Sequence, residues 1–215
     1  MKDLIIICEG PTEIEYCKKV LYWHLKKFDI KLKFILILHS NGGIVSWDIL
    51  KKQIELHYED DNEVTISTFI DYYGLYDYHG YIDWGKAEAE PLKPARMAIL
   101  ENGMKSDLNP NIKFIPFVLL HEFETLAFCD YDIFEKIYES REAKFPKLKE
   151  ICDDYPNPED INNGLTTAPS KRLIKNIKRY KKTSDSINIT TQIGLVKIRS
   201  MCPGFNAWIT KLENI

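Results

Sequence analysis

Acidic residues stand at or just after the ends of two strand-like runs of this chain, where they could hold a metal ion. Glu9 and Glu13 follow the run 4–8, and Asp71 follows the run 65–70. Acids at the carboxyl ends of parallel strands lie at the edge of an open α/β sheet where ligands bind. Mg²⁺ and Mn²⁺ take hard oxygen ligands and complete their shell with waters and a substrate phosphate. These positions therefore predict a divalent-metal site and metal-assisted chemistry on a phosphate or carbonyl group.

The same acids can also be explained without any chemistry. Glu9 would precede a helix, whose dipole favours a negative charge at that end. Asp71 would begin a turn, a common place for aspartate. At this point both interpretations of Glu9 and Asp71 stay open.

Two further acids, Glu122 and Glu124, follow the apolar run 112–120. If that run is a parallel strand, they lie at the same sheet edge and could supply oxygens or orient a water. The stretch is not the zinc-protease motif H-E-x-x-H, because the second His is absent. Alternatively, both acids lie in the first turn of a helix. A position in the first turn of a helix is enough to explain Glu124 taken alone. Both acids nevertheless remain candidate site residues.

Lys171 and Arg172 are candidate phosphate ligands. They come directly after Thr167–Ser170, at the expected start of a basic amphipathic helix over 169–182. Backbone N–H groups at a helix start favour an anion. The remaining basic residues of this helix are better explained as a solvated face.

Aromatic residues crowd the segment 72–84, which contains five tyrosines and a tryptophan. Such rings could stack on nucleobases. They could equally pack over the edge of a sheet, since Tyr buries well when its hydroxyl finds a partner. The sequence favours packing.

The elements that would position these residues follow from the apolar pattern. Strands are expected at 4–8, 33–38, 65–70 and 112–120, with helices at 11–28 and about 47–57 between the first three. We expect Thr12 and Glu15 to cap the first helix. Pro116 predicts an edge position or a bulge for the last strand. Alternating strands and helices predict an α/β fold with a mainly parallel sheet flanked by helices.

The segment 72–111 interrupts this alternation and is expected to be an insertion with a helix near 94–103. After about residue 130 the chain is expected to be helical. Helices are expected at 186–201 and 204–212, in addition to the basic helix at 169–182. The expected division is an α/β core over 1–130 and a C-terminal helical part over 131–215, packed on the core.

Composition bounds the class of protein. The chain has 215 residues, 45% of them hydrophobic, and a formal net charge of −3, so no overall basic field indicates nucleic-acid binding. Its five cysteines form no C-x-x-C pair and are expected to be reduced thiols of a cytoplasmic protein. No apolar stretch reaches the length of a membrane span, so no membrane association is expected.

Several of these motifs together resemble those of an uncharacterised bacterial domain-of-unknown-function family. Its members are Toprim-like and often lie in phage-defence operons beside an ATPase gene. The matching stretches are Ile7-Cys8-Glu9-Gly10-x-Thr12-Glu13, Phe69-Ile70-Asp71-Tyr72-Tyr73-Gly74-Leu75, Leu120-His121-Glu122-Phe123-Glu124, Ile161-Asn162-x-Gly164, Thr167-Ala168-Pro169-Ser170-Lys171-Arg172 and Cys202-Pro203-x-Phe205-Asn206-x-Trp208.

This resemblance implies a Toprim-like (Rossmann-like) sheet. Toprim domains bind Mg²⁺ with a Glu after the first strand and an Asp-x-Asp after a later one. Glu9 and Asp71 match the Glu and the first Asp, whereas Tyr73 stands in place of the second Asp. An extra acid soon after the first Glu occurs in the nuclease branch, and Glu13 matches it.

The resemblance thus implies a Mg²⁺- or Mn²⁺-dependent nuclease, or a related phosphodiester-cleaving enzyme, of antiviral defence by abortive infection. Its partners would be nucleic acid (DNA or RNA, tRNA included) and a nearby-encoded ATPase, with a homodimer among the options. The expected metal ligands are Glu9, Glu13 and Asp71. The other expected site residues are Glu122 and Glu124 for catalysis and Lys171 and Arg172 for phosphate.

Two other hypotheses stay open. The chain could be a non-catalytic Toprim-like scaffold or regulatory subunit that binds the ATPase, as the missing second Asp suggests. It could also be a hydrolase or transferase acting on nucleotides rather than on polymers.

Overall fold

The computed structural model describes residues 2–39, 43–161 and 164–215. It contains two compact units: unit 1 comprises Met1–Leu120 and Trp208–Ile215, and unit 2 comprises His121–Ala207. This division comes earlier than the boundary near residue 130 expected from the sequence, and the residues from Trp208 onward belong to unit 1.

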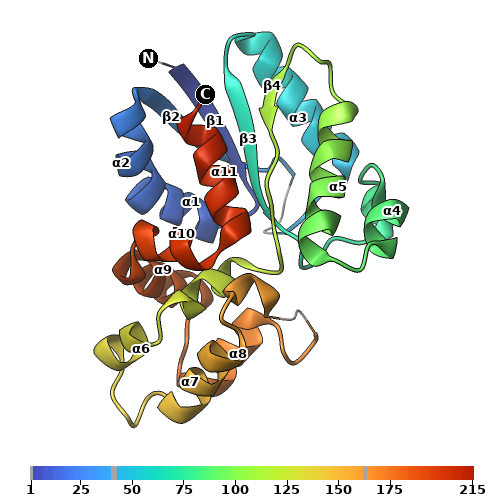
Figure 1. Ribbon diagram of the computed structural model, residues 1–215. Helices are drawn as coiled ribbons and strands as arrows, with labels where there is room; N and C mark the ends of the chain where they lie inside the picture. The colour runs from blue at the N-terminus through green and yellow to red at the C-terminus, as the bar shows by residue number, and fades with distance from the viewer. Residues whose placement is uncertain (1, 40–42, 162–163) are drawn as a thin grey trace. The chain divides into compact units, whose positions relative to one another are not determined.

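Unit 1 is built on a mainly parallel sheet of five strands (Figure 1). The strand order is β2-β1-β3-β4, and a short β5 pairs with the end of β3. Their bounds are β1 (Lys2–Cys8), β2 (Ile30–Leu36), β3 (Thr65–Asp71), β4 (Lys113–Ile115) and β5 (Val118–Leu119). The α/β class with a mainly parallel sheet, predicted from the sequence, is confirmed.

Helical segments connect the strands of unit 1 at the places the apolar pattern predicts. The first connection is continuous helix with a π-helical middle, the second holds one α-helix, and the connection from β3 to β4 holds a short 3₁₀ turn and two α-helices. The segments are α1 (Pro11–Tyr16), η1 (Cys17–Leu21), α2 (Tyr22–Leu25), η2 (Lys26–Phe28), α3 (Trp47–Asp60), η3 (Asp77–His79), α4 (Trp84–Ala89) and α5 (Lys93–Ser106).

The expected strand at 112–120 is broken into β4 and β5 at Pro116. Beyond the break, the side chain of Thr68 replaces a backbone partner: the Phe117 N–H donates to Thr68 Oγ1 (2.9 Å), and the Thr68 hydroxyl donates to the Phe117 carbonyl (3.2 Å). β4 ends the strand order, so the edge position predicted from Pro116 is confirmed.

The two faces of β3 are covered differently. Ile66 and Ile70 belong to the apolar core that includes residues of α3 and α5. On the opposite face the ring of Trp208 stacks on Phe117 (4.5 Å between ring centroids, 6° between planes) and lies 5.0 Å from Phe69. Alternate residues of a strand point to opposite faces, so β3 is buried on both.

Glu101 of α5 gives unit 1 a pH-dependent stability. Its carboxylate accepts a hydrogen bond from the Val118 N–H (3.1 Å), and burial raises its pKa to about 6. Because the folded pKa lies above the unfolded value of 4.5, the folded state binds the proton more tightly. The stability is therefore full below pH 4.5 and falls as the pH rises through 6.

We expect Glu101→Gln to remove this dependence while keeping the acceptor for Val118. The free energy of unfolding, measured by urea titration from pH 4 to pH 8, should fall by about 2 kcal/mol more in the parent chain than in the variant. Parallel curves for the two proteins would contradict the raised pKa.

Unit 2 is helical, as expected for the C-terminal part. Its elements are η4 (Phe123–Cys129), α6 (Asp132–Ile137), α7 (Phe145–Asp154), η5 (Pro158–Asp160), α8 (Pro169–Asn176), α9 (Lys182–Ile193), α10 (Leu195–Met201) and the first part of α11 (Pro203–Glu213). No helix within the described residues is long and apolar enough to cross a bilayer.

Two of the helices predicted in this part are wrong in extent. The basic helix expected over 169–182 ends at Asn176, because Ile177 forms an antiparallel bridge with Ala143 and Arg179 has a φ of 57°. The helix expected over 186–201 starts at Lys182 and is interrupted at Gly194. Gly194 has a φ of 81° and an extended ψ, which are incompatible with a helix.

Candidate functional site

The structure brings Glu9 and Asp71 together at the carboxyl edge of the sheet. Cys8, the last residue of β1, pairs with Phe69 of β3, and the Glu9 N–H donates to the Phe69 carbonyl (3.1 Å). The Glu9 side chain then reaches across the end of β3, where its Oε2 accepts the Asp71 N–H at 2.8 Å. Two acids far apart in sequence thus meet where parallel sheets bind ligands.

Tyr81 is a buried tyrosine that senses the charge of Glu9 and that sequence reasoning did not single out. Burial, and then the negative charge of Glu9, raise its pKa well above the usual value. Its hydroxyl is buried and has no hydrogen-bond partner among the residues described. Burial and the charge of Glu9 thus both favour the neutral form of the Tyr81 hydroxyl. From the sequence it was one of several tyrosines, and nothing in the spacing distinguished it.

Glu13 has a structural task in α1. Its Oε2 accepts the Gly10 N–H at 2.9 Å, which closes the turn between β1 and α1. The predicted cap of Thr12 with Glu15 is therefore wrong: Gly10 is the N-cap residue, and Glu13 is the acid that reaches back. A Cβ at position 10 would lie 3.1 Å from Glu13 Oε2, so the close approach favours glycine there.

Carboxylate oxygens such as those of Glu9 and Asp71 are the type of ligand that a hard divalent cation prefers. Across residues 2–39, 43–161 and 164–215, no three His, Cys, Asp or Glu side chains are grouped to hold a metal. Mg²⁺, however, is commonly held by one or two carboxylates together with waters and substrate phosphates. A two-carboxylate site at the strand ends is thus consistent with Mg²⁺ or Mn²⁺.

Glu122 and Glu124 lie in unit 2, where they belong to a buried polar cluster. Glu122 accepts the Ser170 N–H and the Ser170 hydroxyl, both at 3.0 Å. Glu124 lies 3.3 Å from the Ser186 hydroxyl. Lys182 Nζ stands 3.5 Å from an oxygen of each carboxylate. The cluster ties η4 to the starts of α8 and α9.

This cluster also changes the interpretation of Lys171 and Arg172. The anion favoured at the start of α8 is the protein's own Glu122. Arg172 donates to the Thr167 carbonyl (2.6 Å), and its guanidinium lies 5.2 Å from the centre of the Tyr155 ring. Lys171 is exposed. Of the two predicted phosphate ligands, Lys171 thus points to solvent and Arg172 is held by its neighbours.

We expect Ser170→Ala to destabilise unit 2 by about 1.5–3 kcal/mol, because it removes a hydrogen bond to a buried carboxylate. Urea unfolding followed by circular dichroism would measure the loss. Ser184→Ala, at an exposed serine of α9, is the control and should change stability by less than about 0.5 kcal/mol. Equal effects of both changes would contradict the inferred role of Glu122.

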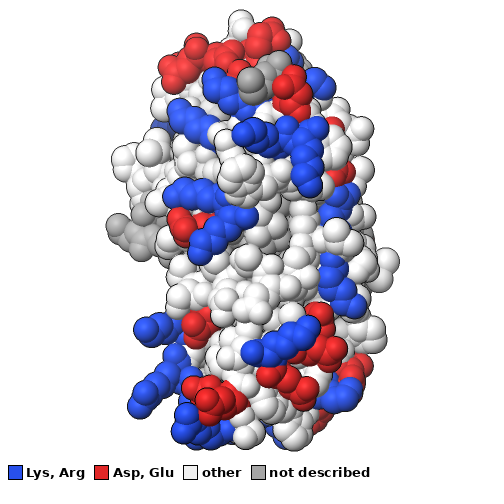
Figure 2. All heavy atoms as spheres, turned by 90° about the vertical axis from the view of Figure 1, so that its left-hand side faces the viewer, with Lys and Arg blue, Asp and Glu red and all other residues white. Residues whose placement is uncertain are grey.

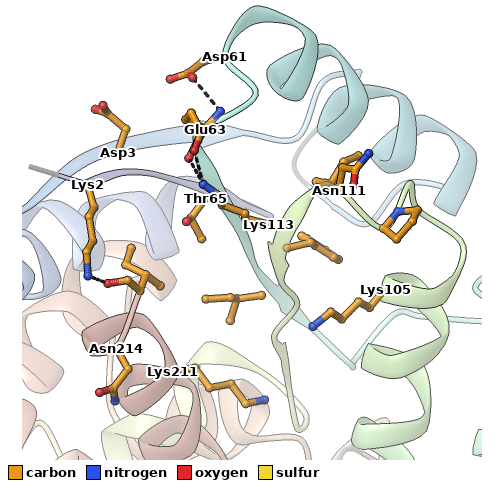
Figure 3. Close-up of a pocket in the computed structure, with 15 residues that line it drawn as sticks. Lys2, Asp3, Asp61, Glu63, Thr65, Lys105, Asn111, Lys113, Lys211 and Asn214 are labelled. Atoms are coloured by element: carbon orange, nitrogen blue, oxygen red, sulfur yellow. Dashed lines mark hydrogen bonds and ion pairs between the residues drawn. The ribbon is translucent and has the colours of Figure 1, made fainter.

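A cavity of about 760 Å³ opens at the opposite, amino edge of the sheet in unit 1 (Figure 3). Lys105 and Lys211 extend into it, whereas Lys113 is paired with Glu63 at 2.5 Å. Its lining mixes lysines with the acids Asp3, Asp61 and Glu63, so it is not a uniformly positive site. The face shown in Figure 2 is likewise a mixture of basic and acidic side chains.

Comparison with known proteins identifies a family without identifying an activity. A family model described as "Domain of unknown function (DUF4276)" matches residues 8–213, a span that contains every candidate residue above. No curated protein matches the chain, and no solved structure matches it. Asn162 belongs to the motif Ile161-Asn162-x-Gly164, on which part of the family resemblance rests, and it lies outside the residues that the structure describes.

Proposed function

We propose that this chain, which belongs to the DUF4276 family of unknown function, is a Mg²⁺- or Mn²⁺-dependent nuclease or related phosphodiester-cleaving enzyme. One observation carries the proposal: the 2.8 Å hydrogen bond from the Asp71 backbone N–H to Glu9 Oε2 places the Glu9 carboxylate at the residue whose own carboxylate ends β3. We further propose a Toprim-like core, a cytoplasmic location, and a role in bacterial phage defence with an ATPase partner. These rest on the motif resemblance.

In this proposal Glu9 and Asp71 hold the metal. The ion, when bound, would neutralise phosphate charge and activate a water. Glu13 keeps the turn at Gly10 closed and so fixes where Glu9 leaves β1.

Glu122 and Glu124 are left out of the proposed metal shell. Their oxygens already face Ser170, Ser186 and Lys182 within unit 2. We propose that Glu122 supports the start of α8, which carries the exposed Lys171 as a contact for phosphate, and that Glu124 supports α9.

Calorimetry with Mn²⁺, followed by cleavage assays on plasmid, single-stranded DNA and tRNA, tests the proposal. We expect metal binding in the parent chain, cleavage that requires the metal, and loss of both in Glu9→Gln. Metal-independent cleavage, or binding that survives Glu9→Gln, would refute the assigned site.

The second candidate is a non-catalytic scaffold that docks on an ATPase. One observation favours it: Tyr73 stands where the Toprim pattern has its second Asp. Absence of metal binding at millimolar Mn²⁺, together with a tight complex with the neighbouring ATPase, would establish this alternative.

A further inference from the structure

The aromatic segment after β3 is divided between core and surface. Leu75 and Tyr81 are 4% and 3% exposed and belong to the apolar core of unit 1. Between them, Tyr76 and Tyr78 are 53% and 77% exposed. Core packing, which the sequence favoured, therefore does not account for these two tyrosines.

The exposed rings are ordered relative to one another. Tyr76 and Tyr78 stack at 5.4 Å with 17° between their planes. His79 stacks on Tyr76 at 6.1 Å and 25°, and lies 4.3 Å from Tyr78. The three rings, which we name the aromatic platform, thus present flat π surfaces.

Two hydrogen bonds within the turn hold the platform in place. The Tyr76 N–H donates to His79 Nδ1 (3.0 Å), and the His79 N–H donates back to the Tyr76 carbonyl (3.0 Å). Gly80 ends the turn with a φ of 68°, and the buried Leu75 and Tyr81 anchor both sides. A ligand would therefore meet rings that are already ordered, which lowers the entropy cost of binding.

The composition of this stretch favours contact with an uncharged, flat group. Over 72–90 the chain carries the acids Asp77, Asp83, Glu88 and Glu90 but only one Lys, and this Lys86 is paired with Asp83 at 2.6 Å. No exposed aliphatic side chain of large size accompanies the tyrosines within this stretch, all of which the structure describes. This stretch thus offers a flat ring face but no unpaired basic side chain for a phosphate, and it lacks the aliphatic side chains of a mixed apolar protein contact.

We propose that the aromatic platform stacks on unpaired nucleobases, so that the substrate is single-stranded nucleic acid. Stacking of a base on an aromatic ring depends little on the nucleotide sequence. Removing one such ring is expected to weaken binding roughly tenfold. The segment starts directly after Asp71, so a base held there belongs to a strand that passes the carboxyl edge of β3. This inference rests on the proposed function for its use in cleavage, whereas the binding itself does not.

Fluorescence anisotropy with a labelled oligothymidine in EDTA measures binding without cleavage. We expect Tyr78→Ala to weaken binding about tenfold and Tyr78→Phe to leave it unchanged. Leu92→Ala, at a side chain 67% exposed outside the platform, is the matched control and should bind like the parent. The ratio between parent and Tyr78→Ala should be insensitive to salt, because a ring and not a charge is removed.

Equal affinities of the parent and Tyr78→Ala would overturn the proposal, and so would tighter binding of duplex than of single strand. A change in oligomeric state in Tyr78→Ala, measured by light scattering, with unaltered oligonucleotide binding would assign the platform to a protein contact instead. Binding that depends on Tyr78 in a chain without nuclease activity would uphold the platform and refute the nuclease. Cleavage that needs Asp71, together with binding that does not need Tyr78, would uphold the nuclease and refute the platform.

Discussion

Asp71→Asn should lower metal-dependent cleavage by at least about 100-fold while the fold stays intact. A bound metal contributes several kcal/mol of transition-state stabilisation, and each 1.36 kcal/mol corresponds to about a tenfold change in rate. The variant keeps the shape of the side chain and the backbone N–H that binds Glu9 Oε2. The loss would therefore report on the carboxylate charge and not on the geometry of the strand end.

Single-turnover cleavage at saturating Mn²⁺ measures this effect, with thermal unfolding to confirm the fold. Asp48→Asn, an exposed acid in the first turn of α3, carries the same chemical change away from the site and should retain parent activity. Near-parent cleavage by Asp71→Asn would remove this residue from the metal site. Glu9→Gln should lower metal-dependent cleavage by a similar factor, because Glu9 and Asp71 are proposed to bind the same metal ion.

The position of this pair was predictable because it depends on a short-range pattern. Each acid follows an apolar run long enough for one buried strand, and parallel strands place their carboxyl ends at one edge. No spacing within one strand reveals, however, that the Glu9 side chain bends onto the Asp71 N–H. That contact depends on the register Cys8↔Phe69, which only the paired strands define.

The environments of Glu122 and Glu124 could not be read from the sequence. Their partners, Ser170, Lys182 and Ser186, are distant in the chain and unremarkable in type. The same limit explains the error over the basic helix. Its amphipathic sequence pattern continues past Asn176, although the helix itself ends there. A tertiary bridge between Ala143 and Ile177 ends it, and local propensity carries no information about that bridge.

The aromatic segment shows a different limit. Its composition allowed either packing or base stacking, and the structure contains both kinds of ring, with Tyr81 buried and Tyr78 exposed. Which ring goes where is set by the turn that ends at Gly80, because a positive φ there reverses the chain between two core anchors. Residue type alone does not encode that division.

Trp208→Ala should cost about 3–5 kcal/mol of unfolding free energy, the range for a fully buried large aromatic side chain. Trp208 is 1% exposed, stacks on Phe117 and donates its indole N–H to Ser67 Oγ at 2.9 Å. Ser67 in turn donates to the Ile115 carbonyl (2.6 Å), so the indole supports both β3 and β4.

Urea unfolding followed by far-ultraviolet circular dichroism measures the loss without relying on tryptophan emission. Trp23→Ala, at a side chain 61% exposed, is the matched control and should change stability by less than about 0.5 kcal/mol. Trp208→Phe should fall between the two, because it keeps a ring against Phe117 and loses the bond to Ser67. Equal stability of the two alanine variants would show that this face of β3 does not depend on Trp208. A large loss would instead link the C-terminal residues of the chain to the strand that ends in Asp71.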